Sequence, residues 1–517
     1  MDEQTWQPEI DELRRLETEA EEMGGPDKVE RQHHFGKLTV RERIDQLVDP
    51  GTFHEIGAIA GKQVLQADGT RRFQPANFVM GRATLDGRPI VVGGDDFTVR
   101  GGASDASIAA KQVMAEQLAN EYRIPIVRLV DGTGGGGSIK SLEESGYTYI
   151  PANPGWEWVV ANLATVPVVS LALGSVAGLG AARVVASHYS LMVRDISQVF
   201  VAGPPLVAHL GETVTKEELG GVHIHGHNGT VSDVVSSEHE AFERTRHFLS
   251  YLPSSVDELA DRTEPDDDPD RADDWLIGAI PRNRRQGYAI RPIITSVVDE
   301  GTWFEIGAGW GRSAVTGLAR LDGWPVAVLS SDPMYYGGGL TADSSMKMEA
   351  FVELADTFHL PVVHLVDQPG FVIGVEAERA ATIRHGARAL AAVYQAQVPW
   401  CSVILRRAFG VGGAAHSNHT RVAFRAAWPS GDWGSLPLEG GIEAAYRAEL
   451  EAAPDRDRLR AEIDDRMNAI RSPFRTAGAF GVEEIIDPRQ TRRFLCEFAN
   501  LAAPLRRPGP VSWPHRG

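Results

Sequence analysis

A chain of 517 residues is too long for one hydrophobic core, so two domains of about 250 residues are expected. The 70 acidic and 51 basic residues give a net charge of −19, and the lack of a long basic run excludes nucleic acid and anionic membranes as expected partners. The chain has no apolar run of about 18 residues and no export signal, so it is predicted to be cytoplasmic. Its two cysteines, Cys401 and Cys496, suggest neither a disulfide framework nor a zinc site.

Two helices are predicted near the N-terminus. In residues 9–23 apolar side chains recur at helical spacing among acidic ones, which predicts an amphipathic helix. Thr39 and Glu42 have the spacing of a capping box, which predicts that a second helix begins there. The sequence DPG at residues 49–51 ends that helix.

A long internal repeat starts near residue 53. Residues 81–89 (GRATLDGRP) return as residues 317–325 (GLARLDGWP), an offset of 236 residues from 81 to 317. The offset holds without a gap through four later pairs: Gly102 and Gly338, Lys111 and Lys347, Pro125 and Pro361, and Asp131 and Asp367. The chain is therefore predicted to contain one fold twice.

The elements of each copy predict an α/β fold. LDG between alternating apolar runs is typical of a β-hairpin. Helices are expected over residues 105–121 and 343–358, and the strands that follow them over 126–131 and 362–367. The acidic, proline-containing segment 261–274 has the composition of a linker, so domains are predicted at 1–265, with a helical N-terminal extension, and at 275–517.

In each copy a buried strand runs into a glycine-rich turn. Residues 166–173 (VPVVSLAL) lead into 174–181 (GSVAGLGA), and residues 398–405 (VPWCSVIL) lead into 406–413 (RRAFGVGG). Glycines let another molecule approach the backbone closely. We call residues 174–181 and 406–413 the first and second amide turns, and predict that each stabilises an anion.

Six motifs in order resemble the carboxyltransferase (β) subunits of biotin-dependent acyl-CoA carboxylases, such as the propionyl-CoA and methylcrotonyl-CoA carboxylase β subunits. They are GKLTVRERI at 36–44, DFTVRGG at 96–102, EELGG at 217–221, DQPGF at 367–371, IRHGA at 383–387 and IIDPRQTR at 485–492. The resemblance covers almost the whole chain. It implies two tandem crotonase-like (ClpP/crotonase superfold) domains, a hexameric or mixed ring, an acyl-CoA substrate, and biotin on a separate carrier, with biotin carboxylase and biotin carrier subunits as partners.

The resemblance also implies site residues. The family's paired oxyanion amides fall at Gly178 and Leu179 in the first half and at Gly410 and Val411 in the second. A slipped alignment would move the first pair toward Gly180 and Ala181. The residues expected to contact substrate are Gly134, Gly135, Gly136, Gly180, Phe409, Gly412 and Ala414, and no metal is expected.

The chemistry agrees with two anion sites. Carboxylation of a thioester at its α, or vinylogous, carbon proceeds through an enolate, whose negative oxygen needs fixed donors in a dry site. The ureido oxygen of biotin needs the same donors when carbon dioxide leaves. The biotin nitrogen is then basic enough to take the α proton, so no protein acid or base is required.

Two other functions stay open from the sequence. A decarboxylase would use the same sites in reverse, and a catalytically silent partner subunit would keep the fold without the activity. Gly136 stands where the family usually has an arginine, which puts the polar contacts of the pocket in doubt. Ala414 stands where many relatives have aspartate or a bulkier residue, which predicts an acyl group larger than acetyl or propionyl.

Two motifs suggest other chemistry. Residues 132–137 (GTGGGG) match a dinucleotide-binding fingerprint with Glu157 downstream, but the equivalent strand of the second copy leads to QPG at 368–370, so a loop near CoA or biotin is favoured. The sequence MKM at 346–348 resembles a biotin attachment site, yet Lys347 matches Lys111 on a predicted helix, which argues against attachment.

Several side chains have a functional and a structural interpretation. For His223, His225 and His227 a surface loop is favoured over a zinc site. Packing is slightly favoured over an acyl pocket for Trp156 and Trp158. Arg384 and His385 could equally have a structural role or bind a ligand. Arg406 and Arg407 could equally bind CoA phosphates or a carboxylate, or face solvent.

Overall fold

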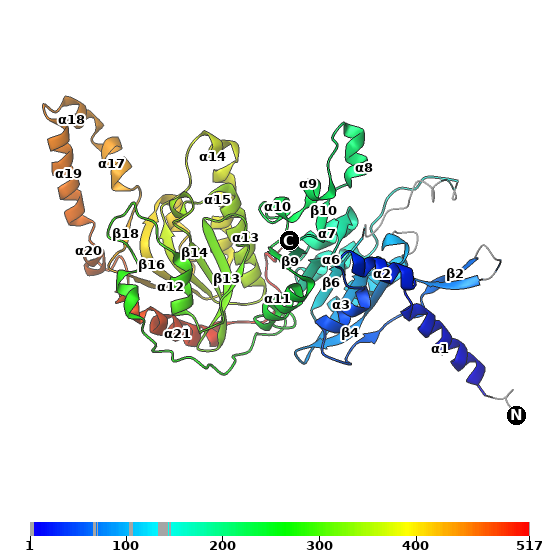
Figure 1. Cartoon of the computed structure of the whole chain (residues 1–517). Helices are drawn as coiled ribbons and strands as arrows, with labels where there is room; N and C mark the ends of the chain where they lie inside the picture. Colours follow the sequence, from blue (N-terminus) through cyan, green and yellow to red (C-terminus); the bar gives the residue numbers. More distant parts are fainter. Residues whose placement is uncertain are drawn as a thin grey trace. The chain divides into compact units, whose positions relative to one another are not determined.

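The computed structural model describes residues 5–65, 69, 71–102, 107–132, 143 and 146–515. The chain divides into two compact units, Met1–Glu258 together with His515–Gly517, and Leu259–Pro514 (Figure 1). The acidic segment 261–274 lies in the second unit. There the Arg271 guanidinium donates to the carbonyls of Ser296 and Val298, both at 3.0 Å.

The first unit is built on a seven-stranded sheet in the order β1-β4-β5-β6-β7-β9-β11. Its strands are β1 (His54–Glu55), β4 (Phe78–Leu85), β5 (Arg88–Asp95), β6 (Ile126–Val130), β7 (Val168–Ala172), β9 (Tyr189–Val193) and β11 (Asp233–Val235). Strands β5 to β11 are parallel, and β6, β7 and β9 are buried along their whole length, as expected for strands covered on both faces. Two small sheets pair β2 (Gly61–Leu65) with β3 (Arg71–Pro75) and β8 (Ser175–Ala177) with β10 (Gln198–Phe200).

The helices of the first unit are α1 (Gln7–Glu21), α2 (Pro26–His34), α3 (Val40–Leu47), α4 (Ala109–Tyr122), α6 (Trp156–Asn162), α7 (Leu179–Val185), α8 (Pro204–Val207), α9 (Lys216–Gly220), α10 (Val222–His225) and α11 (Glu238–Ser250). The N-terminal predictions are confirmed by α1 and by the capping box of α3, in which Thr39 and Glu42 bond reciprocally. Helix α2 between them was not predicted.

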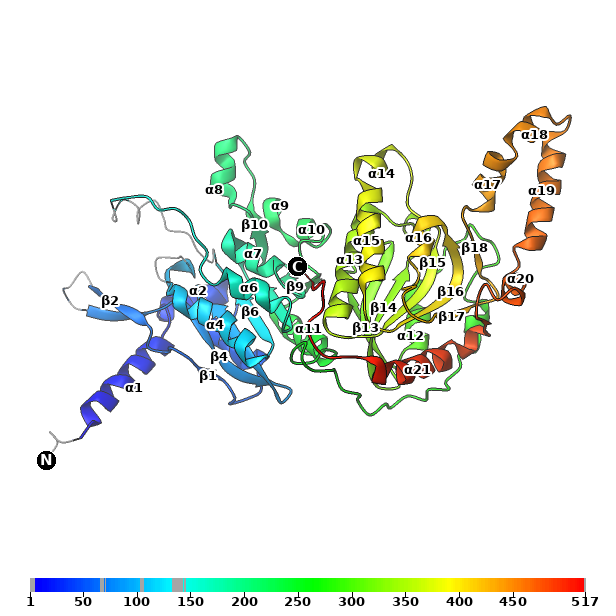
Figure 2. The same ribbon diagram turned by 180° about the vertical axis from the view of Figure 1, so that it is seen from behind.

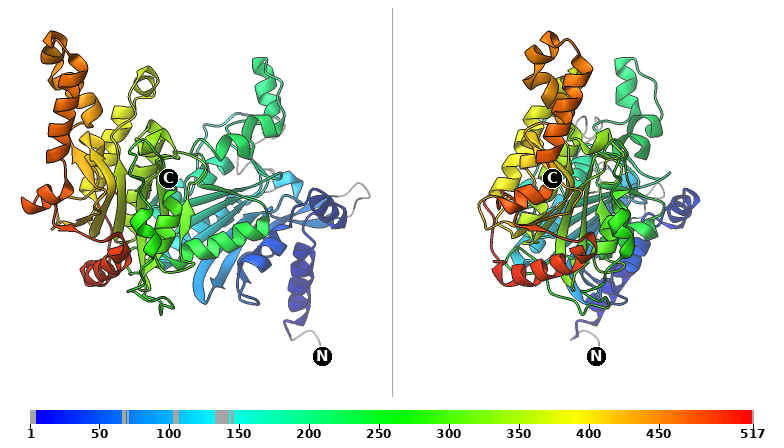
Figure 3. Two further views of the ribbon diagram at one scale, coloured as in Figure 1. Left: turned by 60° about the vertical axis from the view of Figure 1, so that its left-hand side comes forward. Right: turned by 90° about the vertical axis from the view of Figure 1, so that its left-hand side faces the viewer.

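The second unit repeats this plan with the order β12-β13-β14-β15-β16-β17-β19, and β18 pairs with β16. Its strands are β12 (Phe304–Ile306), β13 (Ala314–Leu321), β14 (Trp324–Ser331), β15 (Val362–Gln368), β16 (Trp400–Phe409), β17 (Phe424–Ala427), β18 (Asp432–Gly434) and β19 (Glu484–Ile485). Its helices are α12 (Ile290–Val297), α13 (Ala342–Thr357), α14 (Val375–Arg379), α15 (Thr382–Gln395), α16 (Gly410–Ala414), α17 (Leu438–Ala445), α18 (Arg447–Ala452), α19 (Arg456–Ile470), α20 (Pro473–Gly478) and α21 (Thr491–Ala502). Figure 2 shows α13 and α15 side by side on this unit, and Figure 3 shows α17 to α19 standing away from its sheet.

The internal repeat is confirmed at the level of single residues. The hairpin of β4 and β5 closes between Leu85 and Arg88, and the hairpin of β13 and β14 closes between Leu321 and Trp324. Both are two-residue turns with positive φ at the aspartate and the glycine, as the LDG motif predicts. The helix predicted over 343–358 is α13; the one over 105–121 is α4 from Ala109, and residues 105 and 106 lie outside the described residues.

The paired lysines of the repeat have the same structural role. The Lys111 ammonium donates to the carbonyl of Gly57 at 2.9 Å, and the Lys347 ammonium donates to that of Gly307 at 2.7 Å. Lys347 also donates to Ala314 and is only 4% exposed. A lysine held in this way cannot present its amine for attachment of biotin.

The two cysteines are both buried. Cys401 is buried on strand β16, and Cys496 is buried on helix α21. Both belong to one apolar cluster in which α12 and α21 cover the sheet of the second unit. In the part of the chain that the structure describes, no helix combines the length and apolarity needed to cross a bilayer.

Candidate functional site

The first amide turn presents main-chain hydrogens at the start of α7. Gly178 adopts φ 58° and ψ −122°, a conformation open to glycine, and is exposed. Its N–H donates to the carbonyl of Phe200 at 3.2 Å, because β8 pairs with β10. The amides of Leu179, Gly180 and Ala181 bond to no acceptor among the described residues. These three amides, rather than that of Gly178, are thus not engaged within the described chain; Leu179 is half-buried, and Gly180 and Ala181 are buried.

The second amide turn has the same form. Gly410 is exposed, has φ 60°, and opens helix α16. The amides of Gly410, Val411 and Gly412 make no hydrogen bond to any residue within the described ranges. A Cβ at Gly412 would lie 3.1 Å from Cα of Gly370, so glycine allows close packing against the DQPGF segment without a shift of that segment. Neither turn is covered by side chains at its exposed glycine.

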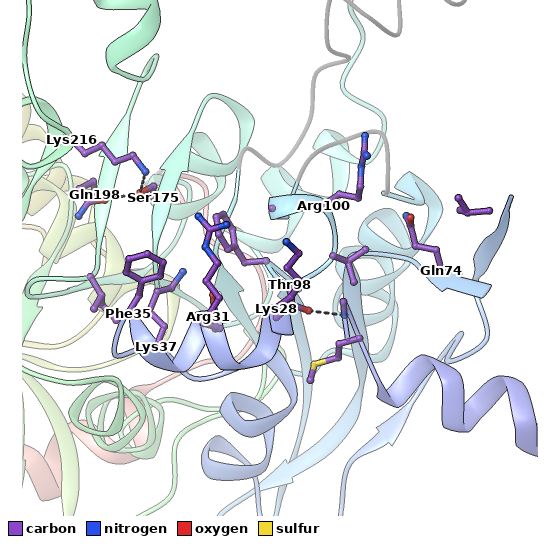
Figure 4. Close-up of a pocket in the computed structure, with 18 of the residues that line it drawn as sticks. Lys28, Arg31, Phe35, Lys37, Gln74, Thr98, Arg100, Ser175, Gln198 and Lys216 are labelled. Carbon is purple, nitrogen blue, oxygen red and sulfur yellow. Dashed lines mark hydrogen bonds between the residues drawn. The ribbon is translucent and has the colours of Figure 1, made fainter. Parts of the chain in front are cut away.

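A cavity of about 820 Å³ in the first unit lies next to the first amide turn (Figure 4). Of the first amide turn, Ser175 on β8 lines this cavity, whereas residues 178–181 are not among its lining residues. The Ser175 hydroxyl accepts from the Lys216 ammonium at 3.2 Å. The other cations lining it are Lys28, Arg31, Lys37, Arg72 and Arg100, whereas Asp195 is the one acidic residue among the described lining residues. The cavity therefore suits a polyanionic ligand, although the whole chain is acidic.

A cavity of about 840 Å³ in the second unit occupies the equivalent place. Three of its lining residues match the first cavity through the repeat: Gly337 matches Gly101, Arg407 matches Ser175, and Ser430 matches Gln198. It is lined by six arginines, Arg282, Arg284, Arg285, Arg406, Arg407 and Arg471, and by the predicted substrate residue Phe409. The duplication has thus kept a cavity as well as a turn in each unit.

In each unit a buried aspartate at the end of the central strand, β6 or β15, binds cationic side chains from segments around the site. Asp131 accepts from Lys37 at 2.8 Å and from Arg43 at 2.9 Å. Its repeat partner Asp367 accepts from Arg406 at 2.9 Å and from Arg407 at 2.6 Å. Burial by itself raises the pKa of Asp367, but the two arginines hold it below its ordinary value.

These hydrogen-bond networks decide whether Arg406 faces solvent or an anion. They also include residues, such as Arg43, that the sequence interpretation did not assign to the site. Arg406 is 4% exposed and pairs with Asp367, so it does not face solvent. The Asp131 and Asp367 pair was visible in the repeat, but its partners come from distant segments. Arg43 bonds Asp131 from 88 residues away, a contact that no local pattern indicates.

The remaining predicted residues are placed as follows. Gly134, Gly135 and Gly136 lie outside the described residues. Gly180 lines a cavity of about 20 Å³ with Asp95 and Arg183, where burial raises the pKa of Asp95 to about 6. Ala414 is exposed and lines a cavity of about 240 Å³ together with Gly410, His416 and Trp433.

The histidine motif does not form the predicted loop. His223 and His225 lie on the short helix α10, and the His225 ring bonds the carbonyl of Val199 at 2.8 Å. Over the described ranges no group of three His, Cys, Asp or Glu side chains is arranged to hold a metal ion. Trp156 and Trp158 are half-buried on α6, and Arg384 and His385 lie in the first turn of α15.

Comparison with known proteins gives a family and a fold. The carboxyl transferase domain matches residues 31–516. A propionyl-CoA carboxylase carboxyltransferase subunit of Haloferax mediterranei is 33% identical over 498 residues, 95% of each chain. The methylmalonyl-CoA decarboxylase subunit alpha of Veillonella parvula is 31% identical over 475 residues, 91% of each chain. The transcarboxylase 12S hexamer structure with methylmalonyl-CoA and methylmalonic acid bound has a TM-score of 0.88 and 31% identity, covering 99% of this chain and 98% of that one.

Proposed function

Because the chain belongs to the carboxyl transferase domain family and both units have the crotonase-like fold, we propose that it is the carboxyltransferase component of an acyl-CoA carboxylase. It moves carbon dioxide from carboxybiotin to the α or vinylogous carbon of an acyl-CoA. The observation that carries this proposal is the duplication of both the amide turn and the adjoining cationic cavity, one set in each unit.

The first unit takes the acyl-CoA. CoA carries a pyrophosphate and a 3′-phosphate, which match the cations around the first cavity. The thioester oxygen then reaches the amides of Leu179 and Gly180, which hold it as it becomes the enolate oxygen. Backbone donors suit this task because they are fixed before the reaction and need no reorganisation.

The second unit takes biotin. Carboxybiotin, when bound, supplies the carbon dioxide and a basic nitrogen for the α proton. The amides of Gly410 and Val411 hold the ureido oxygen, and Phe409 and the buried Asp367 network keep this turn in place. No metal in this subunit is required by that chemistry, because the acid–base step needs no further group.

The proposed carrier of biotin, the partner subunits, the assembly and the compartment follow from the proposed carboxyltransferase function. Biotin is carried on a separate protein, since Lys347 is buried, and the partners are a biotin carboxylase and a biotin carrier subunit. The chain assembles as a hexamer or as a mixed ring, and it acts in the cytoplasm. We propose that the two functional halves of the chain are residues 1–265 and residues 275–517.

The assay that tests this function is carboxyl transfer from methylmalonyl-CoA to free biotin. Carboxybiotin is expected to form, with little carbon dioxide released when biotin is left out. Rapid release without biotin or a carrier would instead favour the decarboxylase, the function named for the Veillonella relative. Neither reaction with any partner added, for methylmalonyl-CoA or for its longer-chain analogues, would favour a silent partner subunit.

In the proposed ring, the acyl group held by the first unit of one subunit meets biotin at the second unit of another, so the cavity beside Ala414 supports an acyl group larger than acetyl or propionyl. Alanine leaves open space there, beside Gly410 and Trp433. Running the carboxylation assay with acyl-CoAs of graded length measures the preference directly. A clear preference for acetyl-CoA would refute this part of the proposal.

Removing two cations of the first cavity is expected to weaken binding of the CoA ester. Lys28 and Arg31 lie one turn apart on α2, and neither has an ion-pair partner within the described part of the chain. The double change Lys28→Ala, Arg31→Ala should raise KM by about 100-fold or more with kcat unchanged, because charged hydrogen bonds contribute about 1.5–3 kcal/mol each.

The matched control for this change is Arg14→Ala on α1, an exposed cation that does not line the cavity. It should leave KM as it is. A KM shift of the same size in both proteins would show that overall charge, rather than the cavity, sets the affinity.

A further inference from the structure

The far end of helix α7 is held by two buried side chains from the sheet of the first unit. Arg128 on β6 donates to the carbonyls of Arg183 at 3.0 Å and Ala186 at 2.6 Å. Ser170 on β7 donates to the same Arg183 carbonyl at 3.1 Å. Both side chains are at most 5% exposed. They therefore fix the carbonyl end of the short helix whose opposite end carries the first amide turn.

The second unit has the same arrangement beyond helix α16. The carbonyl of His416 accepts from the Ser402 hydroxyl at 2.7 Å and from Nδ1 of His364 at 3.0 Å. Burial lowers the pKa of His364 to about 3, so its ring is neutral, and the carbonyl partner places the hydrogen on Nδ1. The indole of Trp400 donates to the same carbonyl at 2.9 Å.

The two anchors are related by the internal repeat. His364 follows Arg128 by 236 residues, the offset of the paired strands, and Ser402 follows Ser170 by 232 residues, the offset of the paired turns. The serine is retained, whereas arginine and histidine replace one another. What the two repeats share is a set of buried donors to the carbonyl end of the turn helix.

Such an anchor matters because the helices are short. Helix α7 has seven residues and α16 has five, so few internal hydrogen bonds fix their orientation. A helix that rotates about its carbonyl end moves the amides at its other end. Displacing a catalytic group by about 1 Å can cost about 100-fold in rate.

We propose that Ser170 with Arg128, and Ser402 with His364, are positioning residues that orient the two amide turns. This inference rests on the proposed function of those turns. None of the four side chains touches substrate in it; each acts through the helix that it anchors.

The test compares Ser170→Ala and Ser402→Ala with Ser330→Ala in the methylmalonyl-CoA and biotin assay. Ser330 is the matched control, since its hydroxyl is buried and donates to a strand carbonyl, that of Leu365, at 2.7 Å. The two anchor variants should lose about tenfold in kcat with KM unchanged, because ground-state binding stays intact while donor alignment is lost. Unchanged kcat, or an equal loss in Ser330→Ala, would overturn the proposal.

Two further measurements test the proposal beside the serine variants. His364→Asn keeps a donor near the Nδ1 position and should restore kcat relative to His364→Leu; equal loss in both would count against positioning. Hydrogen–deuterium exchange of the peptides over 179–186 and 410–416 should speed up in the matching serine variant alone. This readout needs no turnover, so a wild-type protein without transfer activity refutes the proposed function and still leaves the anchor measurable.

Discussion

Replacing Leu179 with proline is expected to lower kcat for carboxyl transfer by about 100- to 1,000-fold, which corresponds to about 2.7–4 kcal/mol in the barrier. Proline removes one of the amides that we assign to the enolate oxygen. The helix should survive, because Leu179 is the first residue of α7, where proline is favoured and no helical hydrogen bond is lost. Gly178, which would precede the proline, has φ 58° and ψ −122°. This is the mirror image of the extended conformation that residues before proline prefer, and glycine, which lacks a Cβ, can adopt either hand.

Leu179→Ala is the control for this prediction, since it shortens the same half-buried side chain and keeps the N–H. Its kcat should stay close to that of the wild type. Steady-state kinetics with methylmalonyl-CoA and biotin, with the melting temperature of each variant alongside, separate the amide from the side chain. Equal activity in the proline and alanine variants would remove this turn from the mechanism.

Replacing Asp367 with asparagine is expected to destabilise the second unit by about 3–5 kcal/mol, because it leaves two arginines facing each other without their carboxylate. Asp367 is fully buried and also accepts from the Tyr288 hydroxyl at 2.9 Å. Scanning calorimetry of the full chain measures the loss. Because Arg407 lies on β16 within the second amide turn, kcat should fall as well.

The pH dependence gives the same prediction an independent readout. The folded-state pKa of Asp367 is below its unfolded value, so its contribution to stability is present above the unfolded pKa of about 3.9 and is lost as pH falls through the lower, folded value. Asp367→Asn should remove that part of the acid sensitivity. Asp487→Asn, which breaks an exposed pair with Arg489, should cost much less stability and serves as the control.

Much of the architecture could be predicted because the relevant signals are local. The LDG hairpins, the capping box at Thr39 and the glycine turns each depend on residues within one short segment, and the repeat showed them twice. The pairing of Lys111 with Lys347 in the repeat likewise predicted that Lys347 is structural, and both amines bond to equivalent glycine carbonyls.

The donors of the first amide turn could not be predicted in full. The resemblance points to Gly178 and Leu179, yet the Gly178 amide bonds to Phe200, a residue of strand β10. That bond exists because β8 and β10 pair in a separate small sheet. No periodicity in the sequence indicates that pairing, so the availability of Leu179, Gly180 and Ala181 follows only from the folded chain.

By itself, then, the amino-acid sequence determined the duplication, the α/β class, the family and the position of both glycine turns, since these depend on local conformational preference and on spacing along the chain. Tertiary structure alone decided which main-chain amides are available, which charges surround Asp131 and Asp367, and that each unit has a cationic cavity beside its turn. The physical reason is that hydrogen bonds, burial and cavities join segments far apart in sequence, and their partners are set by packing.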